Sequence, residues 1–169
     1  SPLNVAPLVQ PSAVRYDTFK DFTPLSTAAV GPFVLIGRSG LAPANMADLI
    51  KLVRSQPGKL NIGTDGVGTS LHITSEMIQH RAGLQLVHVP YKSGPQVLAD
   101  VAGGQVDLGI LPLTLAQAFI RDGRVRAYGV TSKARWPGLP DVPALAEQAE
   151  LRDLDVESWL GLLGPANLA

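Results

Sequence analysis

The stretch that most constrains this chain runs from residue 60 to residue 72 and reads LNIGTDGVGTSLH. It begins as a short apolar strand, continues as a turn rich in glycine and hydroxyl side chains, and leads into an amphipathic helix. The first turn of a helix leaves its backbone N–H groups unpaired and carries roughly half a positive charge. Because glycine lets a ligand approach the backbone closely, this arrangement suits a phosphate, a sulfate or a carboxylate.

The same stretch also has a simpler interpretation, in which Thr69 or Ser70 caps a helix that follows a strand and nothing is bound. The glycine spacing matches neither the dinucleotide-binding pattern nor the phosphate-loop pattern, and no lysine follows it. Asp65 also opposes anion binding, because a carboxylate in the turn repels another carboxylate. The residues of the turn therefore leave both interpretations open.

The composition indicates one globular domain without a strong charge preference. The chain has 169 residues, of which 46% are hydrophobic and 17% charged, and its 14 basic residues balance 14 acidic ones. This balance gives no reason to expect nucleic acid or an anionic membrane as a partner. The chain has no cysteine, which excludes disulfides and thiolate metal sites. No apolar run approaches the ~20 residues that span a bilayer, and residues 1–4 do not resemble a signal peptide.

Short apolar segments alternate with amphipathic ones along the chain, and this rhythm predicts an α/β domain. We expect strands at 33–37, 60–63, 84–89, 106–111, 125–130 and 156–163, and helices near 45–56, 69–81, 93–102, 112–120 and 142–149. Such an order favours a mainly parallel sheet flanked by helices on both faces. Ligands of such sheets bind at the carboxyl ends of the strands. Three connections fall at that edge, at residues 64–70, 90–95 and 111–113.

Several short motifs occur in an order that resembles one protein family. They are KDFTP at 20–24, PGKL at 57–60, GVGT at 66–69 with His72, VHVPYK at 87–92, GGQVD at 103–107, GRVRA at 123–127, VTS at 130–132, LPDVP at 139–143, SW at 158–159 and GL at 161–162. Together they resemble the substrate-binding proteins of tripartite tricarboxylate transporters, also called the Bordetella uptake gene (Bug) family. The resemblance covers almost the whole chain.

The resemblance implies a periplasmic receptor of two lobes, of which this chain matches the second alone. We therefore expect a single α/β lobe of the type II periplasmic-binding-protein class. Residues 1–27 are expected to form an extended arm or hinge segment and residues 28–155 the ligand-binding lobe. Residues 156–169 are expected to form a hinge strand that returns toward the first lobe. The first lobe's own ligand loop has no counterpart in this sequence.

The resemblance also implies that the glycine turn of this lobe donates backbone and hydroxyl hydrogen bonds to a ligand carboxylate. The matching positions are Thr64, Asp65, Gly66, Gly68, Thr69 and Ser70. Tyr91, Lys92 and Ser93 would line the same cleft. The chain departs from the family at Asp65, where a small residue is expected, and at Leu111, where the family often has an aspartate near the ligand. A leucine there would favour an aliphatic ligand stem over an amino group.

The other candidate residues have simpler structural roles. We expect His72 to pack or cap beneath the turn, and His88 to be half-buried without the partners that a metal needs. Trp136 is expected to pack in its loop, and Trp159 in the core or hinge. Ser70 and His72 do not face each other on a helix, and no acid that could orient the histidine is evident. We therefore expect no enzyme activity, no cofactor and no metal.

These observations predict a solute-binding lobe of a tripartite tricarboxylate-type transport system, which holds a small carboxylate at a helix N-terminus. Binding would be weak or absent with one side of the cleft alone. Besides the ligand, the expected partners are membrane subunits of the transporter and a second copy, in a homodimer or an arm-swapped oligomer, because one lobe exposes an apolar cleft face. Nucleic acid is not expected. Two alternatives remain, a structural domain that has lost binding and an α/β enzyme acting on a phosphorylated substrate.

Overall fold

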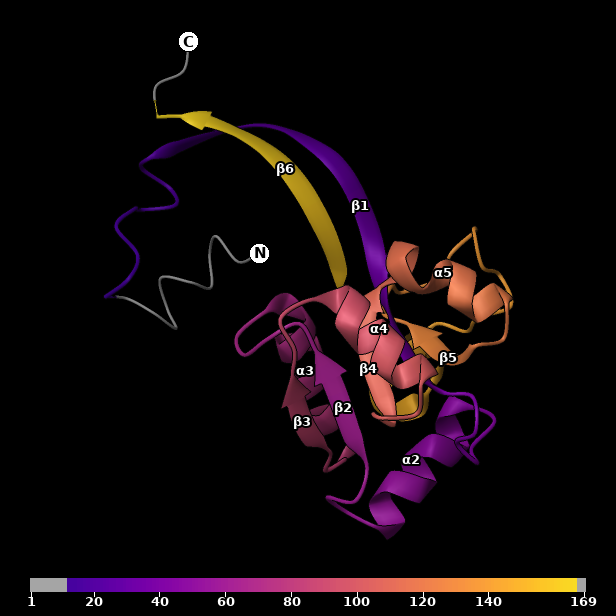
Figure 1. The fold of residues 1–169 in the computed structure, drawn as a ribbon. Coiled ribbons are helices and arrows are strands. Elements are labelled where there is room, and N and C mark those ends of the chain that lie inside the picture. The colour runs from indigo at the N-terminus through magenta and orange to yellow at the C-terminus, as the bar shows by residue number, and fades with distance from the viewer. Residues whose placement is uncertain (1–11, 167–169) are drawn as a thin grey trace.

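The computed structural model describes residues 12–166, so the part of the expected arm at residues 1–11 lies outside the described residues. The elements are β1 (Phe22–Arg38), α2 (Met46–Ser55), β2 (Asn61–Thr64), α3 (Ser70–Ala82), β3 (Val87–Pro90), α4 (Gly94–Ala102), β4 (Leu108–Pro112), α5 (Leu113–Arg121), β5 (Val125–Val130), η1 (Leu145–Glu147), η2 (Ala149–Leu151) and β6 (Glu157–Pro165). Figure 1 shows an α/β body from which β1 and β6 extend together as a long curved ribbon.

One mixed sheet forms the centre of the body, with the strand order β3-β2-β4-β1-β5. β2 pairs in parallel with both β3 and β4, whereas β1 pairs antiparallel with β4 and with β5. The strands β2, β3, β4 and β5 therefore point the same way, and β1 runs against them. The expected α/β fold with a mainly parallel sheet is confirmed.

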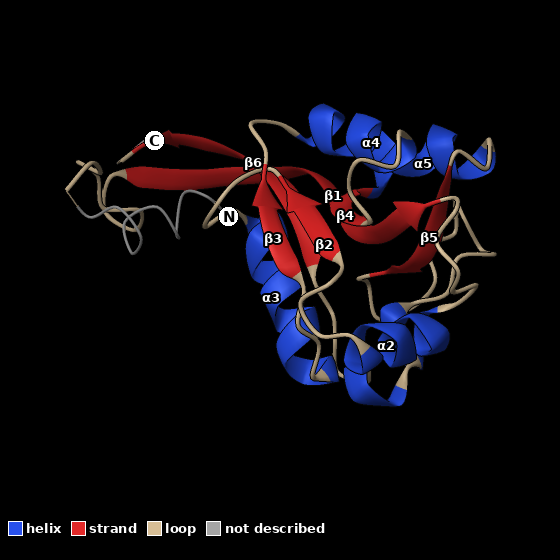
Figure 2. Ribbon diagram, turned by 60° about the horizontal axis from the view of Figure 1, so that its bottom comes forward, coloured by secondary structure: helices blue, strands red, loops and turns tan. Residues whose placement is uncertain are grey.

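The alternation of side chains in β1 explains how helices cover both faces of the sheet. Phe33 and Leu35 belong to the core that contains residues of α2 and α3, whereas Val34 and Ile36 belong to the core that contains residues of α4 and α5. Successive side chains of a strand point to opposite faces, so this fully buried run contributes to both cores. Figure 2 shows the layers, with α2 and α3 on one side of the sheet and α4 and α5 on the other.

The helices begin and end at local sequence signals. Asn45 caps α2 by accepting a hydrogen bond from the backbone N–H of Asp48 at 2.9 Å. Gly83 ends α3 in the left-handed region with a φ of 59°. The Gln79 side chain on α3 then accepts from the backbone N–H of Leu86 at 2.9 Å. Residues 84–86 are thus held against the helix, and the expected strand start at 84 is wrong.

No helix within residues 12–166 is long and apolar enough to cross a membrane.

The expected short helix at 142–149 is also wrong, because this segment forms the two single-turn 3-10 helices η1 and η2. Ala144 pairs with Val130 in an isolated parallel bridge, and the carbonyl of Pro143 accepts from the backbone N–H of Val130 at 2.9 Å. These contacts hold residues 143 and 144 in an extended conformation beside β5. A continuous helix would remove both contacts.

β1 is much longer than the apolar run at 33–37 that predicted it. Its N-terminal part pairs antiparallel with β6, from Phe22 opposite Pro165 to Pro32 opposite Glu157. The division expected between residues 27 and 28 lies inside this strand. Residues 22–32 lack a clear strand pattern and include two prolines. A strand with an open edge tolerates proline, because the missing N–H can face away from the partner strand.

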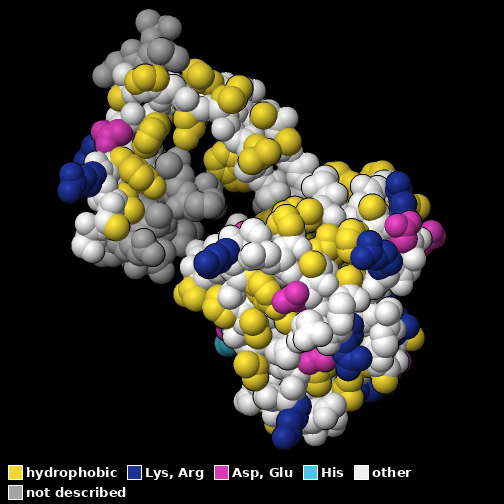
Figure 3. Space-filling view, in the orientation of Figure 1, with side chains coloured by type: hydrophobic (Ala, Val, Ile, Leu, Met, Phe, Trp, Pro, Cys, Tyr) yellow, Lys and Arg dark blue, Asp and Glu magenta, His cyan; other side chains and the backbone are white. Residues whose placement is uncertain are grey.

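The ribbon, formed by residues 22–32 of β1 and by β6, leaves apolar side chains uncovered. Leu25, Val30, Trp159, Leu160 and Leu162 are between 46% and 69% exposed. Figure 3 shows such side chains along the ribbon and over the adjoining part of the body. A two-stranded ribbon without a further layer buries little apolar area. Pairing between β1 and β6 and attachment to the sheet therefore support this part of the chain.

Candidate functional site

The connection between β2 and α3 forms the turn that the sequence predicts. Gly66 and Gly68 have φ angles of 126° and 79°, which residues with a side chain rarely adopt. Thr69 is the N-cap of α3, and its hydroxyl oxygen accepts from the backbone N–H of His72 at 3.2 Å. The same hydroxyl donates to the carbonyl of Gly66 at 2.9 Å. The glycines and the cap together hold the backbone in a tight loop immediately before the helix.

Two stacked imidazoles support this turn. The rings of His72 on α3 and His88 on β3 lie with their centroids 4.2 Å apart. The backbone N–H of Gly68 donates to Nδ1 of His72 at 3.1 Å, and Nε2 of His88 lies 2.7 Å from the Thr64 hydroxyl. Burial, and then the neighbouring His72, lower the pKa of His88. Within the described part of the chain, no group of three or more acidic, histidine or cysteine side chains could hold a metal ion.

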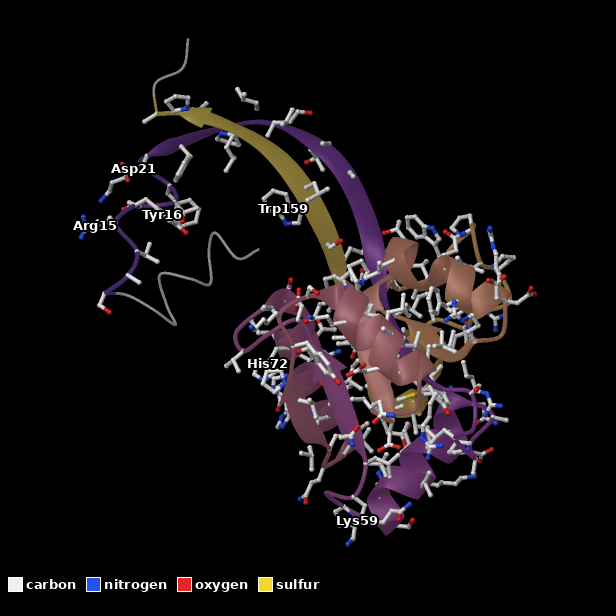
Figure 4. All side chains as sticks on the ribbon, viewed as in Figure 1. Arg15, Tyr16, Asp21, Lys59, His72 and Trp159 are labelled. Atoms are coloured by element: carbon white, nitrogen blue, oxygen red, sulfur yellow. The ribbon has the colours of Figure 1, made fainter. Side chains whose placement is uncertain are left out.

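A pocket of about 460 Å³ lies beside the turn, where the ribbon joins the body. The turn, the first residues of α3 and α5, and parts of β1 and β6 contribute to its walls. Its polar side chains, apart from two tryptophans, are Asp65, Ser70, Thr114, Gln117 and Ser158. The tryptophans are Trp136 and Trp159, and Figure 4 shows Trp159 on the concave side of the ribbon. The pocket thus combines a largely apolar wall with a few polar groups, as small-molecule sites usually do.

Two helix N-termini meet at this pocket. β2 and β4 are parallel neighbours, so the helices that follow them, α3 and α5, begin at the same edge of the sheet. Ser70, Leu71, Leu113 and Thr114 are the first residues of these helices, and all four line the pocket. No acceptor within residues 12–166 pairs with the backbone N–H of Ser70 or Leu71, and no side chain caps α5. Unpaired donors and two positive helix ends therefore border one cavity, which is a favourable setting for an anion.

Asp65 adds a negative charge to the same pocket. Its Oδ1 atom is buried and has no hydrogen-bond partner among the residues that the structure describes. No lysine, arginine or other acidic residue belongs to the pocket lining, so Asp65 carries the one formal charge of its described wall. A buried carboxylate oxygen without a donor is costly, because it has lost its water without gaining a partner.

The expected binding residues of the turn fall into three groups by their structural role. Asp65 and Ser70 line the pocket. Three others determine the backbone path ahead of α3, and these are Gly66, Gly68 and Thr69. Thr64 is fully buried, with its hydroxyl beside His88. These residues thus supply the pocket with the Asp65 carboxylate and the Ser70 hydroxyl, while the Thr64 and Thr69 hydroxyls make hydrogen bonds within the protein.

The neighbouring turn between β3 and α4 carries Tyr91, Lys92 and Ser93, none of which lines this pocket. The Tyr91 hydroxyl donates to Oδ2 of Asp100 on α4 at 2.8 Å. Burial and this carboxylate raise the pKa of Tyr91 to about 12. The Tyr91 backbone N–H also donates to the Thr64 carbonyl at 2.8 Å. Tyr91 therefore joins β2, β3 and α4 at the edge of the sheet.

Leu111 does not face the cleft, so the expectation that it shapes the ligand stem is wrong. Its side chain is fully buried in the core that contains residues of α4 and α5. A Cβ placed on Gly94, the first residue of α4, would lie 3.3 Å from the Leu111 side chain. The residues that follow, Pro112 and Leu113, line the pocket in its place.

The sequence interpretation missed three polar residues of the pocket, Thr114, Gln117 and Ser158. Thr114 and Gln117 lie three positions apart on α5 and so share a face, a spacing that also fits an ordinary solvated helix. Ser158 enters through the ribbon, where its hydroxyl donates to the carbonyl of Gly31 at 3.1 Å. Trp159 is 46% exposed and lines the pocket from β6, within the segment expected to form the hinge strand, so it does not pack in the core.

Comparison with known proteins identifies the family of this chain. The model of the tripartite tricarboxylate transporter family receptor matches residues 1–168. The chain belongs to this family. A curated relative, the UPF0065 protein in the tcbD-tcbE intergenic region of Pseudomonas sp. strain P51, is 39% identical over 152 residues, which are 90% of this chain and 45% of the relative. Protein BugT of Bordetella pertussis is 27% identical over 165 residues, which are 98% of this chain and 50% of BugT. The chain spans about half the length of these relatives.

Solved structures of this receptor family share the fold. A periplasmic transporter superposes with a TM-score of 0.88 at 30% identity and covers 96% of this chain and 54% of its own. Rpa4515 of R. palustris with adipate has a TM-score of 0.83 at 32% identity, and the match covers 90% of this chain and 50% of that protein. MatC of Rhodopseudomonas palustris with bound malate has a TM-score of 0.84 at 27% identity, and the match covers 96% of this chain and 55% of that protein. The chain thus has the fold of one lobe of these receptors, and both the family and its structural neighbours are solute-binding proteins rather than enzymes.

Proposed function

We propose that this chain is the second lobe of a periplasmic solute receptor of a tripartite tricarboxylate-type transport system, and that it binds a small carboxylate without acting as an enzyme. The observation that carries this proposal is the pocket bordered by the N-termini of α3 and α5, where the backbone N–H groups of Ser70 and Leu71 find no acceptor within residues 12–166. Similar proteins hold adipate and malate, which supports a carboxylate as the ligand class. Membrane subunits of the transporter would be its partners.

In this proposal the ligand carboxylate accepts hydrogen bonds from the first turn of α3, including the Ser70 N–H and hydroxyl. Thr114 at the start of α5 supplies a further hydroxyl, and Trp159 covers the aliphatic part of the ligand. Gly66, Gly68 and Thr69 act by holding the turn. One lobe offers contacts on one side of the ligand, so we expect weak binding by this chain alone.

A test that removes one backbone donor is available at Ser70. This residue is the first of α3, where proline is well tolerated, and Thr69 before it has a φ of −71° and a ψ of 163°, which proline also permits. Ser70→Pro deletes both the N–H and the hydroxyl, whereas the matched control Ser70→Ala deletes the hydroxyl alone. We expect Ser70→Pro to weaken adipate or malate binding by about tenfold or more relative to Ser70→Ala, since hydrogen bonds to charged groups contribute about 1.5–3 kcal/mol.

Binding is measured by titrating the isotope-labelled chain with each acid and following the backbone amide signals by NMR, which detects weak saturable binding. We expect the largest shifts at Ser70, Leu71 and Thr114. Equal affinities of Ser70→Pro and Ser70→Ala would contradict a carboxylate at the α3 N-terminus. The absence of saturable shifts with either acid would favour the alternative of a structural domain that has lost binding. Turnover of a phosphorylated compound would favour the enzyme alternative.

A further inference from the structure

We propose that Asp65 makes this pocket selective for a carboxylate that also carries an ammonium group, so that it takes a zwitterion in preference to a dianion. This inference rests on the proposed function and assigns the ligand class of the same site. Two observations carry it, namely the uncompensated charge that Asp65 gives the pocket wall and the two indole rings.

The charge of the wall disfavours a second carboxylate. Asp65 carries the one formal charge among the described lining residues, and no lysine or arginine is present to pair with a second anionic group. The N-termini of α3 and α5 supply positive partial charges for one carboxylate. A second carboxylate of the same ligand would face Asp65 or an apolar wall. Like charges in a partly desolvated site repel each other strongly.

The charge of Asp65 is not compensated by a cation of the described pocket wall. Oδ1 is buried and has no hydrogen-bond partner among residues 12–166. The hydroxyls of Thr64 and Thr69, by contrast, both have partners within the protein. An ammonium group on the ligand, placed in the pocket beside Asp65, would be attracted by the charge of this carboxylate. It would also neutralise the carboxylate that opposes anion binding at the turn.

The indole rings provide a second contact for a cation. Trp136 is half-buried and Trp159 is partly exposed, and both line the pocket. Tryptophan is the aromatic side chain that attracts an ammonium group best, because its ring face is negative. A ligand with a carboxylate at the helix ends and an ammonium group near Asp65 would therefore match the wall in charge at both positions.

Three probes of similar size test this selectivity on the full 169-residue chain. They are ε-aminocaproate, adipate and caproate, which share an aliphatic stem and one carboxylate and differ in an ammonium, a carboxylate or a methyl end. Affinities are measured by NMR titration and by tryptophan fluorescence. We expect ε-aminocaproate to bind at least about tenfold more tightly than adipate, because Asp65 attracts its ammonium group and repels a second carboxylate.

Removing the charge of Asp65 should abolish this preference. Asp65→Asn keeps the size of the side chain, and we expect it to weaken ε-aminocaproate at least about tenfold while adipate binding stays equal or improves. Asp65→Ser tests the same point with a small side chain. Asp153→Asn is the matched control, because Asp153 is exposed and does not line the pocket. The amide spectrum of each variant shows whether it is folded.

Each outcome is decisive. If the wild-type chain binds adipate or caproate as tightly as ε-aminocaproate, the inference is wrong while the proposed carboxylate site stands. The same holds if both Asp65 variants keep the wild-type preference. If none of the three probes binds, the proposed function itself fails and the inference fails with it. If the variants do not fold, the ranking of the probes by the wild-type chain decides.

Discussion

Gly66 shows how a single residue determines the local shape of the site. Its φ of 126° lies outside the range that residues with a side chain normally adopt, although a Cβ there would meet no atom closer than 3.6 Å. The obstacle to another residue is therefore backbone strain rather than a collision. The turn that positions the first amides of α3 depends on this conformation.

Gly66→Ala should lower both stability and ligand affinity. Strain of this kind costs of order 1–3 kcal/mol in the free energy of unfolding, which is measured by chemical denaturation. Gly58→Ala is the matched control, because Gly58 also has a positive φ, 71°, with open space around it, and does not line the pocket. We expect both variants to be less stable but Gly66→Ala alone to lose affinity in the adipate titration. A normal affinity in Gly66→Ala would show that the turn does not position the ligand.

His88 gives stability a dependence on pH at the residue scale. Burial, and then His72, hold its pKa below the ordinary value of 6.5, while Glu76 acts in the opposite direction. The unfolded chain therefore binds a proton at His88 more readily than the folded protein. As the pH falls through 6.5 and toward the lowered pKa, the free energy of unfolding decreases, and above 6.5 the contribution of His88 is fully present.

We expect His88→Gln to flatten this part of the stability profile between about pH 8 and about pH 5, because glutamine does not titrate. The measurement is urea denaturation at a series of pH values. His80→Gln is the control, since His80 is exposed near the C-terminal end of α3 and does not contact the turn. An unchanged slope in His88→Gln would show that His88 does not lose its proton on folding.

At the scale of elements, the site depends on how β2, β3 and β4 place the helices that follow them. All three strands end at one edge of the sheet, and α3 and α5 begin beside each other there. The turn before α4 has a different role, because Tyr91 is anchored to Asp100 on that helix. This contact stabilises the edge of the sheet without contributing a group to the pocket.

Tyr91→Phe tests this division of roles. Loss of the hydrogen bond to Asp100 should lower the free energy of unfolding by about 1 kcal/mol, with thermal denaturation as the measurement. We expect the affinity for adipate to stay within twofold of the wild type, about 0.4 kcal/mol at most. A large loss of affinity in a variant of normal stability would instead indicate that the Tyr91 hydroxyl contacts the ligand, as the family resemblance implies.

At the scale of the whole molecule, the ribbon is the feature that the α/β body leaves uncovered. It carries exposed apolar side chains on both strands, including Leu25 on β1 and Leu160 and Leu162 on β6. Apolar area of this kind favours association with another protein surface. We propose that copies of this chain associate through the ribbon, in a homodimer or an arm-swapped oligomer.

Sedimentation velocity over a range of protein concentrations tests this association. We expect the wild-type chain to form dimers or larger species, and the double change Leu160→Ser with Leu162→Ser to shift it toward the monomer. Ile73→Ser is the control, because Ile73 is also an exposed apolar residue, at 38%, but lies on α3. A wild-type chain that stays monomeric at every concentration would contradict the proposal.

The sequence by itself determined the local features of this protein. The caps at Asn45 and Thr69, the glycine turn before α3 and the order of strands and helices all follow from residues close together in the chain. The motifs along the chain indicated the family for the same reason, since each is a short run of residues. The predictions for 84–86 and 142–149 are wrong because hydrogen bonds to neighbouring elements, α3 and β5 respectively, override the local pattern of these segments.

Only the tertiary structure decided which groups share the pocket. Trp159 and Ser158 reach it because β6 pairs with the N-terminal part of β1, more than a hundred residues earlier in the chain. Leu111 is absent from it because its side chain belongs to the buried core. The charge of Asp65 is uncompensated in the pocket because no basic side chain from another described element lines it. Such contacts depend on strand pairing and packing between distant segments, which a local sequence pattern does not contain.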